Sequence, residues 1–161
     1  MRVFFFVMML RMVIQFICRG NAFRSIIAEA YMNSLRLPGV TALSSGTCAS
    51  RHRESNAKNF SKTLGLLQKH GIKQYAKGHY ADNLDQRLLD KSDIAICLNK
   101  IAYKEATDSF KLPDESYVWD VADLGEEGRI ATNEAEREAF SEDVYEEITN
   151  NVDDLVQALF N

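Results

Sequence analysis

Residues 13–25 read VIQFICRGNAFRS, and this stretch indicates how the rest of the chain folds. Residues 13–17 are a short apolar run rich in β-branched side chains, which is typical of a buried strand. The run stops at Cys18, and Gly20 and Asn21 follow, two residue types that tolerate the positive φ of a tight turn. Over residues 25–35 apolar side chains recur at helical spacing. The stretch therefore predicts a strand, a tight loop and a helix in direct succession.

The remaining sequence continues this alternation of strands and helices. Apolar runs predict strands at residues 40–43, 94–98 and 117–119, and helical spacing predicts helices at residues 56–69, 84–89, 99–110 and 134–159. Because the strands are apolar on both faces, we expect a parallel sheet covered by helices on each side. The expected fold is thus α/β, a three-layer sandwich with a four-stranded parallel sheet and a phosphate-binding loop after the first strand. Ligands of such folds bind beyond the carboxyl ends of the strands, where Cys18 lies.

Length and composition are those of one ordinary globular domain. The chain has 161 residues, of which 46% are hydrophobic and 26% charged. We expect the domain at residues 13–161, behind an N-terminal apolar extension at residues 1–12. That extension is too short to span a bilayer, which takes about 20 apolar residues, and no small-residue cleavage site follows it. We therefore expect a functional start at Met9 or Met12, or an apolar segment against the domain, rather than an export signal.

Charge, cysteines and histidines narrow the class of ligand. Residues 114–161 hold fifteen Asp/Glu and two Lys/Arg, whereas the first 113 residues hold eight and seventeen. A basic face near an anion site attracts anionic substrates, but no basic stripe with interleaved aromatics indicates nucleic-acid binding. The three cysteines and three histidines lack metal-ligand spacing. We expect a cytoplasmic protein with reduced thiols, no metal, no cofactor and no nucleic-acid or membrane partner.

The loop CRGNAFRS has the chemistry of an anion site with a nucleophile. Unpaired amides of the turn and of the first helical residues, together with the positive helix end, form an anion nest. Arg24 can give two parallel hydrogen bonds to phosphate oxygens, and the helix end favours the thiolate form of Cys18. Gly20 lets the backbone approach the anion, Asn21 holds a left-handed turn, and the Ser25 hydroxyl can donate to the Cys18 sulfur. The residues expected to surround the phosphate are Arg19, Gly20, Asn21, Ala22, Phe23, Arg24 and Ser25.

Four stretches together resemble the low-molecular-weight protein tyrosine phosphatase superfamily. They are FICRGNAFRSIIAEA, LSSGT, HYADNLDQRLLDKSDIAICLNK and WDVADL, and their order and spacing agree from about Val13 to the last helix. The superfamily also contains thioredoxin-coupled arsenate reductases and bacterial protein-arginine phosphatases.

The resemblance implies a mechanism with a covalent phosphocysteine. Cys18 attacks phosphorus in line while Arg24 and the loop amides stabilise the equatorial oxygens. Asp123, at the place of the family's Asp-Pro pair, protonates the leaving oxygen and then activates water as a base. Ser44 or Ser45 braces Asn21, and the residues leave open which one. The expected activity is hydrolysis of phosphate monoesters, with phosphorylated protein, chiefly phosphotyrosine, or a small aryl phosphate as substrate.

Several positions depart from the family pattern. Phe23 stands where a second cysteine usually allows a protective disulfide, so Cys18 is more exposed to over-oxidation. Leu124 replaces the proline after the general acid, and Gly125-Glu126-Glu127 replaces an aromatic rim. Arg19 either widens the electropositive mouth or extends to solvent, and Ala22 leaves room beside the phosphate.

Two other functions compete with hydrolysis. Arsenate reductase uses the same loop, but reduction needs further thiols: Cys97 lies in an apolar strand and Cys48 has no closely spaced partner. A phosphate-binding module with little turnover is the other hypothesis, motivated by Phe23 and Leu124.

Overall fold

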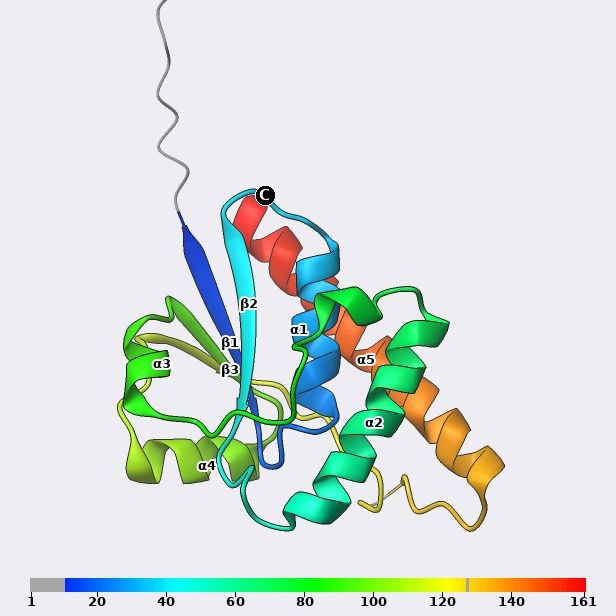
Figure 1. Cartoon of the computed structure of the whole chain (residues 1–161). Coiled ribbons are helices and arrows are strands. Elements are labelled where there is room, and N and C mark those ends of the chain that lie inside the picture. Colours follow the sequence, from blue (N-terminus) through cyan, green and yellow to red (C-terminus); the bar gives the residue numbers. More distant parts are fainter. Residues whose placement is uncertain (1–10, 127) are drawn as a thin grey trace, which may run out of the picture.

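The computed structural model describes residues 11–126 and 128–161, with a four-stranded parallel sheet at the centre (Figure 1). The strands are β1 (Met12–Cys18), β2 (Val40–Gly46), β3 (Ile94–Cys97) and β4 (Glu115–Val118). The helices are α1 (Arg24–Ser34), α2 (Arg53–Lys69), α3 (Gln86–Asp90), α4 (Lys100–Ser109) and α5 (Glu134–Phe160), with a 3-10 turn, η1, at Lys73–Tyr75. Most of the extension expected at residues 1–12, namely residues 1–10, lies outside the described residues, as does Glu127 of the loop after Asp123.

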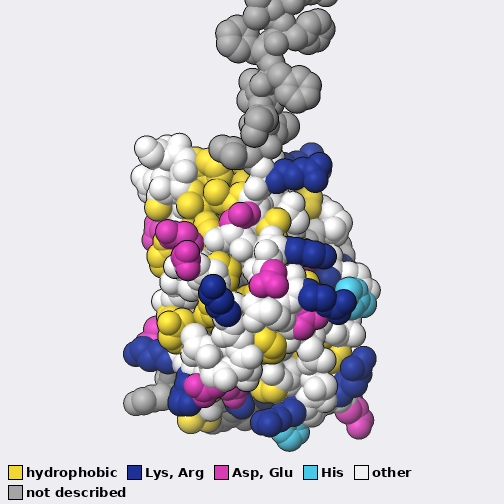
Figure 2. Space-filling view, turned by 90° about the vertical axis from the view of Figure 1, so that its left-hand side faces the viewer, with side chains coloured by type: hydrophobic (Ala, Val, Ile, Leu, Met, Phe, Trp, Pro, Cys, Tyr) yellow, Lys and Arg dark blue, Asp and Glu magenta, His cyan; other side chains and the backbone are white. Residues whose placement is uncertain are grey.

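Helices cover both faces of the sheet, so the expected three-layer α/β sandwich is confirmed. Figure 1 shows α1, α2 and α5 on one side and α3 and α4 on the other. Because side chains alternate along a strand, β1 contributes side chains to two separate hydrophobic cores, one on each face of the sheet. Phe16 packs with Ile26 and Ile148 on the α1/α5 side, whereas Ile17 packs with Ala102 and Ala106 on the α4 side. Figure 2 views the α3/α4 side, where acidic and basic side chains are interspersed.

The strand order places Cys18 in the middle of the sheet's carboxyl edge. β1 is paired with β2 on one side and β3 on the other, all parallel, in the order β2-β1-β3-β4. The register with β2 runs from Met12 opposite Val40 to Cys18 opposite Gly46. Two neighbours thus fix the end of β1, and the loop that follows starts from a rigid point.

The structure differs from the sequence expectation at several element boundaries, of which three are informative. β2 continues through two serines to Gly46, where we expected a loop after residue 43, because buried side chains satisfy both hydroxyls. The edge strand β4 begins at Glu115 and is largely exposed, so its strand is not apolar throughout. Helix α2 begins at Arg53, three residues before the expected start at Asn56.

Candidate active site

The loop between β1 and α1 wraps around the sulfur of Cys18. Cys18 is the last residue of β1 and is only 3% exposed. Asn21 has the left-handed φ of 48°, and its backbone N–H donates to Cys18 Sγ at 3.2 Å. Ser25 Oγ lies 2.9 Å from the same sulfur. One backbone N–H therefore donates to the sulfur, and one hydroxyl lies within hydrogen-bond distance of it.

Arg24 is the first residue of α1, and its guanidinium is held at both ends. Its side chain is 3% exposed; Nη1 donates to the Val121 carbonyl at 2.7 Å and Nη2 to Asp123 Oδ2 at 2.9 Å. Asp123 Oδ1 accepts the backbone N–H of Leu124 at 2.9 Å. The carboxylate expected to act as acid and base thus lies beside the arginine expected to bind phosphate. Asp120 lies elsewhere, in an exposed ion pair with Lys100.

The loop that carries Asp123, called the acid loop from here on, is held in place although Leu124 stands where a proline was expected. Arg129 donates to the Ala122 carbonyl at 2.6 Å and forms an ion pair with Glu147 of α5. The Gly125 N–H donates to the Arg129 carbonyl, and Gly125 has a φ of 88°, which only glycine adopts readily. Arg129 therefore ties both ends of the loop around Asp123 to the long C-terminal helix. Sequence reasoning missed it, because an arginine six residues from the candidate acid has no motif of its own.

The residues behind the loop distinguish the two candidate serines. Asn21 Nδ2 donates to Ser44 Oγ and to Ser25 Oγ, both at 3.0 Å, so Ser44 is the serine that contacts Asn21. Ser45 points to the opposite face of the sheet and accepts from Gln15 Nε2 at 2.8 Å. Asn21 and Ser25 are fully buried, so they support the loop from behind rather than line its open side.

Arg19 is directed away from Arg24 by an acidic partner on α4. Its guanidinium pairs with Glu105 at 3.0 Å, and Thr47 Oγ1 donates to the same carboxylate at 2.5 Å. Partial burial acts to raise the pKa of Glu105, but the hydrogen bonds from Thr47 and Arg19 outweigh it and leave this pKa below its ordinary value. The Arg19 side chain stays 43% exposed, so the ion pair with Glu105 offsets part of its charge without burying it.

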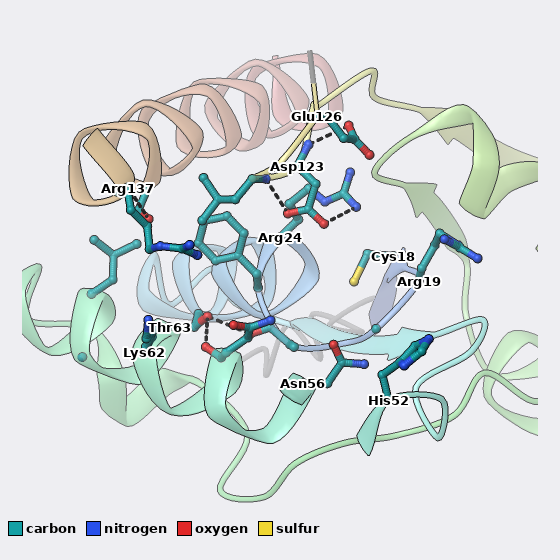
Figure 3. A pocket seen from close by; sticks show the side chains of 18 of the residues that line it. Cys18, Arg19, Arg24, His52, Asn56, Lys62, Thr63, Asp123, Glu126 and Arg137 are labelled. Atoms are coloured by element: carbon teal, nitrogen blue, oxygen red, sulfur yellow. Dashed lines mark hydrogen bonds and ion pairs between the residues drawn. The ribbon is translucent and has the colours of Figure 1, made fainter. Parts of the chain in front are cut away.

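A cavity of about 790 Å³ opens in front of the loop (Figure 3). The loop lines it with Cys18, Arg19, Gly20, Ala22, Phe23 and Arg24. Asp123 and Leu124 line it from the acid loop, and Figure 3 shows Asp123 above Arg24 and Cys18. The cavity continues between α2 and the start of α5. On the α2 side, the residues that line it extend from Asn56 to Lys69. From Asn56 to Lys69, α2 spans about 20 Å, so this space is much longer than a phosphate ion.

The other loop residues shape this cavity through their backbone. Ala22 is 5% exposed, and its carbonyl accepts the Thr63 hydroxyl of α2 at 2.7 Å. A Cβ on Gly20 would lie 3.2 Å from Asn56 Nδ2, a tight fit that glycine avoids. Phe23, at the position before Arg24, is half-buried and packs against the main core. Thus α2 closes one side of the phosphate loop.

The described ranges hold neither a metal cluster nor a membrane span. Within residues 11–126 and 128–161, no cluster of three or more His, Cys, Asp or Glu side chains is arranged to hold a metal ion. In the same part of the chain, no helix has both the length and the apolar composition for crossing a membrane.

Comparison with known proteins identifies the family. The family model for low molecular weight phosphotyrosine protein phosphatase matches residues 13–161, so the chain belongs to this family. A search of the curated proteins finds no match.

Solved structures share the fold at low sequence identity. A low molecular weight protein tyrosine phosphatase from T. tengcongensis has a TM-score of 0.67 at 21% identity, over 91% of this chain and 99% of that one. A thioredoxin-dependent arsenate reductase from Corynebacterium glutamicum has 0.65 at 19%, over 94% of this chain and 63% of that one. The YwlE arginine phosphatase from Geobacillus stearothermophilus has 0.55 at 22%, over 91% and 94%. The fold thus accommodates three chemistries, and the site must decide among them.

Proposed function

We propose that this protein hydrolyses phosphate monoesters through a phosphocysteine on Cys18, and that its physiological substrate is phosphotyrosine in proteins. One observation carries the proposal: Cys18, Arg24 and Asp123 line a single cavity, and each is oriented by its own hydrogen bonds. Nucleophile, phosphate-binding cation and proton donor are the three parts that the reaction needs. Membership in the phosphatase family supports the same reaction.

The reaction proceeds in two displacements at phosphorus. In the first, Cys18 Sγ forms a bond to phosphorus, the bond to the ester oxygen breaks, and protonated Asp123 gives its proton to that oxygen. In the second, Asp123 accepts a proton from water, the water oxygen bonds to phosphorus, and the thiolate leaves. Arg24 binds two equatorial oxygens throughout, so substrate must take the place of the Asp123 carboxylate on Nη2. Both steps together leave Cys18 and Asp123 as they began.

The shape of the cavity favours an aromatic phosphate that is part of a larger chain. Phe23, Leu66 and Leu124 give the cavity apolar wall next to the loop, where the ring of a phosphotyrosine would lie. The length of about 20 Å along α2 equals about six residues of extended polypeptide. Arg51 also lines the cavity, and its positive charge attracts an anionic substrate.

Arsenate reduction is the second candidate, and one observation favours it: Cys48 lines the same cavity as Cys18. Reduction of arsenate requires a second thiol that attacks the sulfur of the arsenylated nucleophile: a disulfide forms, the S–As bond breaks, and its electron pair leaves with arsenic as arsenite. Cys97 is unsuited to that role, because burial raises the pKa of its thiol to about 12. Cys48 is therefore the thiol on which this alternative depends.

We also propose that the protein acts in the cytoplasm. All three cysteines are free, and a thiol nucleophile stays reduced in the cytosol but is capped in oxidising compartments.

The test is an assay of the parent protein on phosphotyrosine peptide, phosphoarginine and small phosphate esters, with Cys18→Ser, Cys48→Ser and Asp123→Asn beside it. We expect the phosphotyrosine peptide to give the highest kcat/KM, Cys18→Ser to be inactive and Cys48→Ser to equal the parent. A parent that binds phosphate but turns nothing over supports a binding module instead. Arsenate-dependent oxidation of a thiol reductant that Cys48→Ser abolishes supports the reductase.

A further inference from the structure

A lysine is buried directly behind the phosphate loop. Lys77 follows η1 in a segment without regular structure, yet its side chain is only 7% exposed. Burying an ammonium group is expensive unless hydrogen-bond acceptors replace the lost water. Lys77 Nζ has three such acceptors: Asp82 Oδ2 at 2.7 Å, the Ser44 carbonyl at 2.6 Å and Asn21 Oδ1 at 3.1 Å.

The contact with Asn21 decides which way its amide faces. An ammonium group only donates hydrogen bonds, so the atom of the Asn21 amide that faces Lys77 must be the oxygen. The backbone N–H of Asp82 donates to the same oxygen at 3.0 Å and requires the same orientation. A flipped amide would bring its NH₂ group against two donors. Lys77 and the Asp82 amide therefore keep Asn21 Nδ2 pointing toward Ser25 and Ser44.

This orientation sets the direction of the hydrogen bonds that reach the nucleophile. Ser25 Oγ accepts from Asn21 Nδ2, which leaves the Ser25 hydroxyl hydrogen free to donate to Cys18 Sγ, 2.9 Å away. Ser44 Oγ also accepts from Asn21 and donates its own hydrogen to the Glu29 carboxylate. Each donor thus points toward the thiolate along the series Lys77, Asn21, Ser25, Cys18.

We propose that Lys77 is a positioning residue for the reaction at Cys18: by fixing the amide of Asn21, it holds the phosphate loop and directs the Ser25 hydroxyl at the thiolate. The inference rests on the proposed phosphatase function only for its kinetic readout. Lys77 touches neither the sulfur nor the phosphate site, so it acts through Asn21 and not as a catalyst itself.

The ionisable side chains around Lys77 pair with it and with one another behind the phosphate loop. Asp82 pairs with Lys77 at 2.7 Å and with His79 at 3.0 Å, and the Glu29 carboxylate lies 3.9 Å from Lys77 Nζ. Burial raises the pKa of Glu29 more than its pairing with Lys77 lowers it. The Asp82 carbonyl and the Leu84 amide are themselves bonded to Gly46 at the end of β2. Lys77 therefore joins the loop after β1 to the carboxyl end of β2.

The effect of removing Lys77 is partial, because the Asp82 amide still holds the Asn21 oxygen. We expect Lys77→Met, which keeps the length but removes the ammonium group, to lower kcat for an aryl phosphate by roughly 10- to 100-fold. KM should change much less, because Arg24 and the loop amides still bind the phosphate. Lys73→Met, at an exposed position four residues away in η1, is the matched control and should equal the parent.

Alkylation of Cys18 by iodoacetamide, followed by peptide mass spectrometry across pH, measures the thiolate without any substrate. In Lys77→Met we expect the midpoint of this pH profile to move upward, because the Ser25 hydroxyl no longer points reliably at the sulfur. Lys77→Arg should restore part of both kcat and the profile. A purely structural lysine would lower Tm without moving the midpoint.

The outcomes separate this inference from the proposed function. Lys77→Met with a parental kcat and a parental alkylation profile overturns the role of Lys77. If Lys77→Met fails to fold, Lys77→Ala with and without methylammonium replaces it, and a rate that methylammonium does not raise overturns the role equally. A parent without phosphatase activity refutes the proposed function, while the alkylation profiles still decide the inference.

Discussion

Replacing Asp123 by asparagine should change chemistry and anion binding in opposite directions. The Asp123 carboxylate accepts a hydrogen bond from Arg24 Nη2 at 2.9 Å, so an incoming phosphate competes with an internal anion for the same donor. The Asp123→Asn side chain would keep the size and one hydrogen bond but lack the charge and the transferable proton. Turnover should therefore fall while inorganic phosphate binds more tightly.

Both magnitudes follow from this geometry. Two unit charges at this separation attract by about 1.4 kcal/mol in bulk water and more in a less polar medium. Asp123 is 38% exposed, so solvent screens the pair. We therefore take about 1 to 2 kcal/mol as the binding free energy that phosphate gains when this carboxylate no longer competes for Arg24. That free energy corresponds to phosphate binding about 5- to 30-fold tighter. Loss of the general acid should lower kcat by about 100- to 10,000-fold, most of all for esters with poor leaving groups.

The assay combines steady-state kinetics with competitive inhibition by inorganic phosphate. Asp120→Asn is the control, since its carboxylate lies in an exposed pair with Lys100 and should affect neither quantity. Phosphate binding that weakens in Asp123→Asn would refute the competition between carboxylate and phosphate. A kcat that is unchanged for a poor leaving group would refute the role of Asp123 as acid.

Two further changes probe the network and the cavity. Burial raises the pKa of Glu29 above its ordinary value of 4.5, so the folded state holds that proton more tightly than the unfolded state, and stability falls as pH rises through the folded pKa. Glu29→Gln should remove this fall. Urea unfolding at pH 5 and pH 8 would detect the change as a flatter pH dependence of the free energy of unfolding. Gly65 lies in α2, lines the cavity and has nothing within 4 Å of a built Cβ, so Gly65→Leu should strengthen the helix by about 0.5 to 1 kcal/mol. The same leucine should lower kcat/KM for a phosphotyrosine peptide and spare a small aryl phosphate, and equal losses on both substrates would contradict a peptide-binding role for the cavity.

The loop was predictable because its chemistry is local. Strand, turn and helix follow each other within residues 13–35, and the Cys18 sulfur is contacted by Asn21 and Ser25 of the same stretch. The alternation of strands and helices predicted the sheet for the same reason. Asp123 required the family resemblance, because nothing near it in the sequence shows that it reaches Arg24.

The supporting residues could not be predicted, because they come from segments with no pattern of their own. Lys77, Glu105 and Arg129 each look like ordinary surface charges in the sequence, and only the fold brings them to the loop, to Arg19 and to the acid loop. Ser44 and Ser45 could not be told apart from the sequence for a related reason. Neighbouring strand residues face opposite sides, and only the register of β2 against β1 tells which side holds Asn21.

The measurement that bears most directly on the account is acid quenching of the parent protein during turnover of a phosphotyrosine peptide, followed by mass spectrometry of the peptide that contains Cys18. Asp123→Asn, in which water activation is also impaired, gives the intermediate more time to accumulate. We expect one phosphoryl group on Cys18 in the quenched samples and none in Cys18→Ser. Turnover by Cys18→Ser, or turnover by the parent with phosphate on any other residue, would contradict Cys18 as the nucleophile.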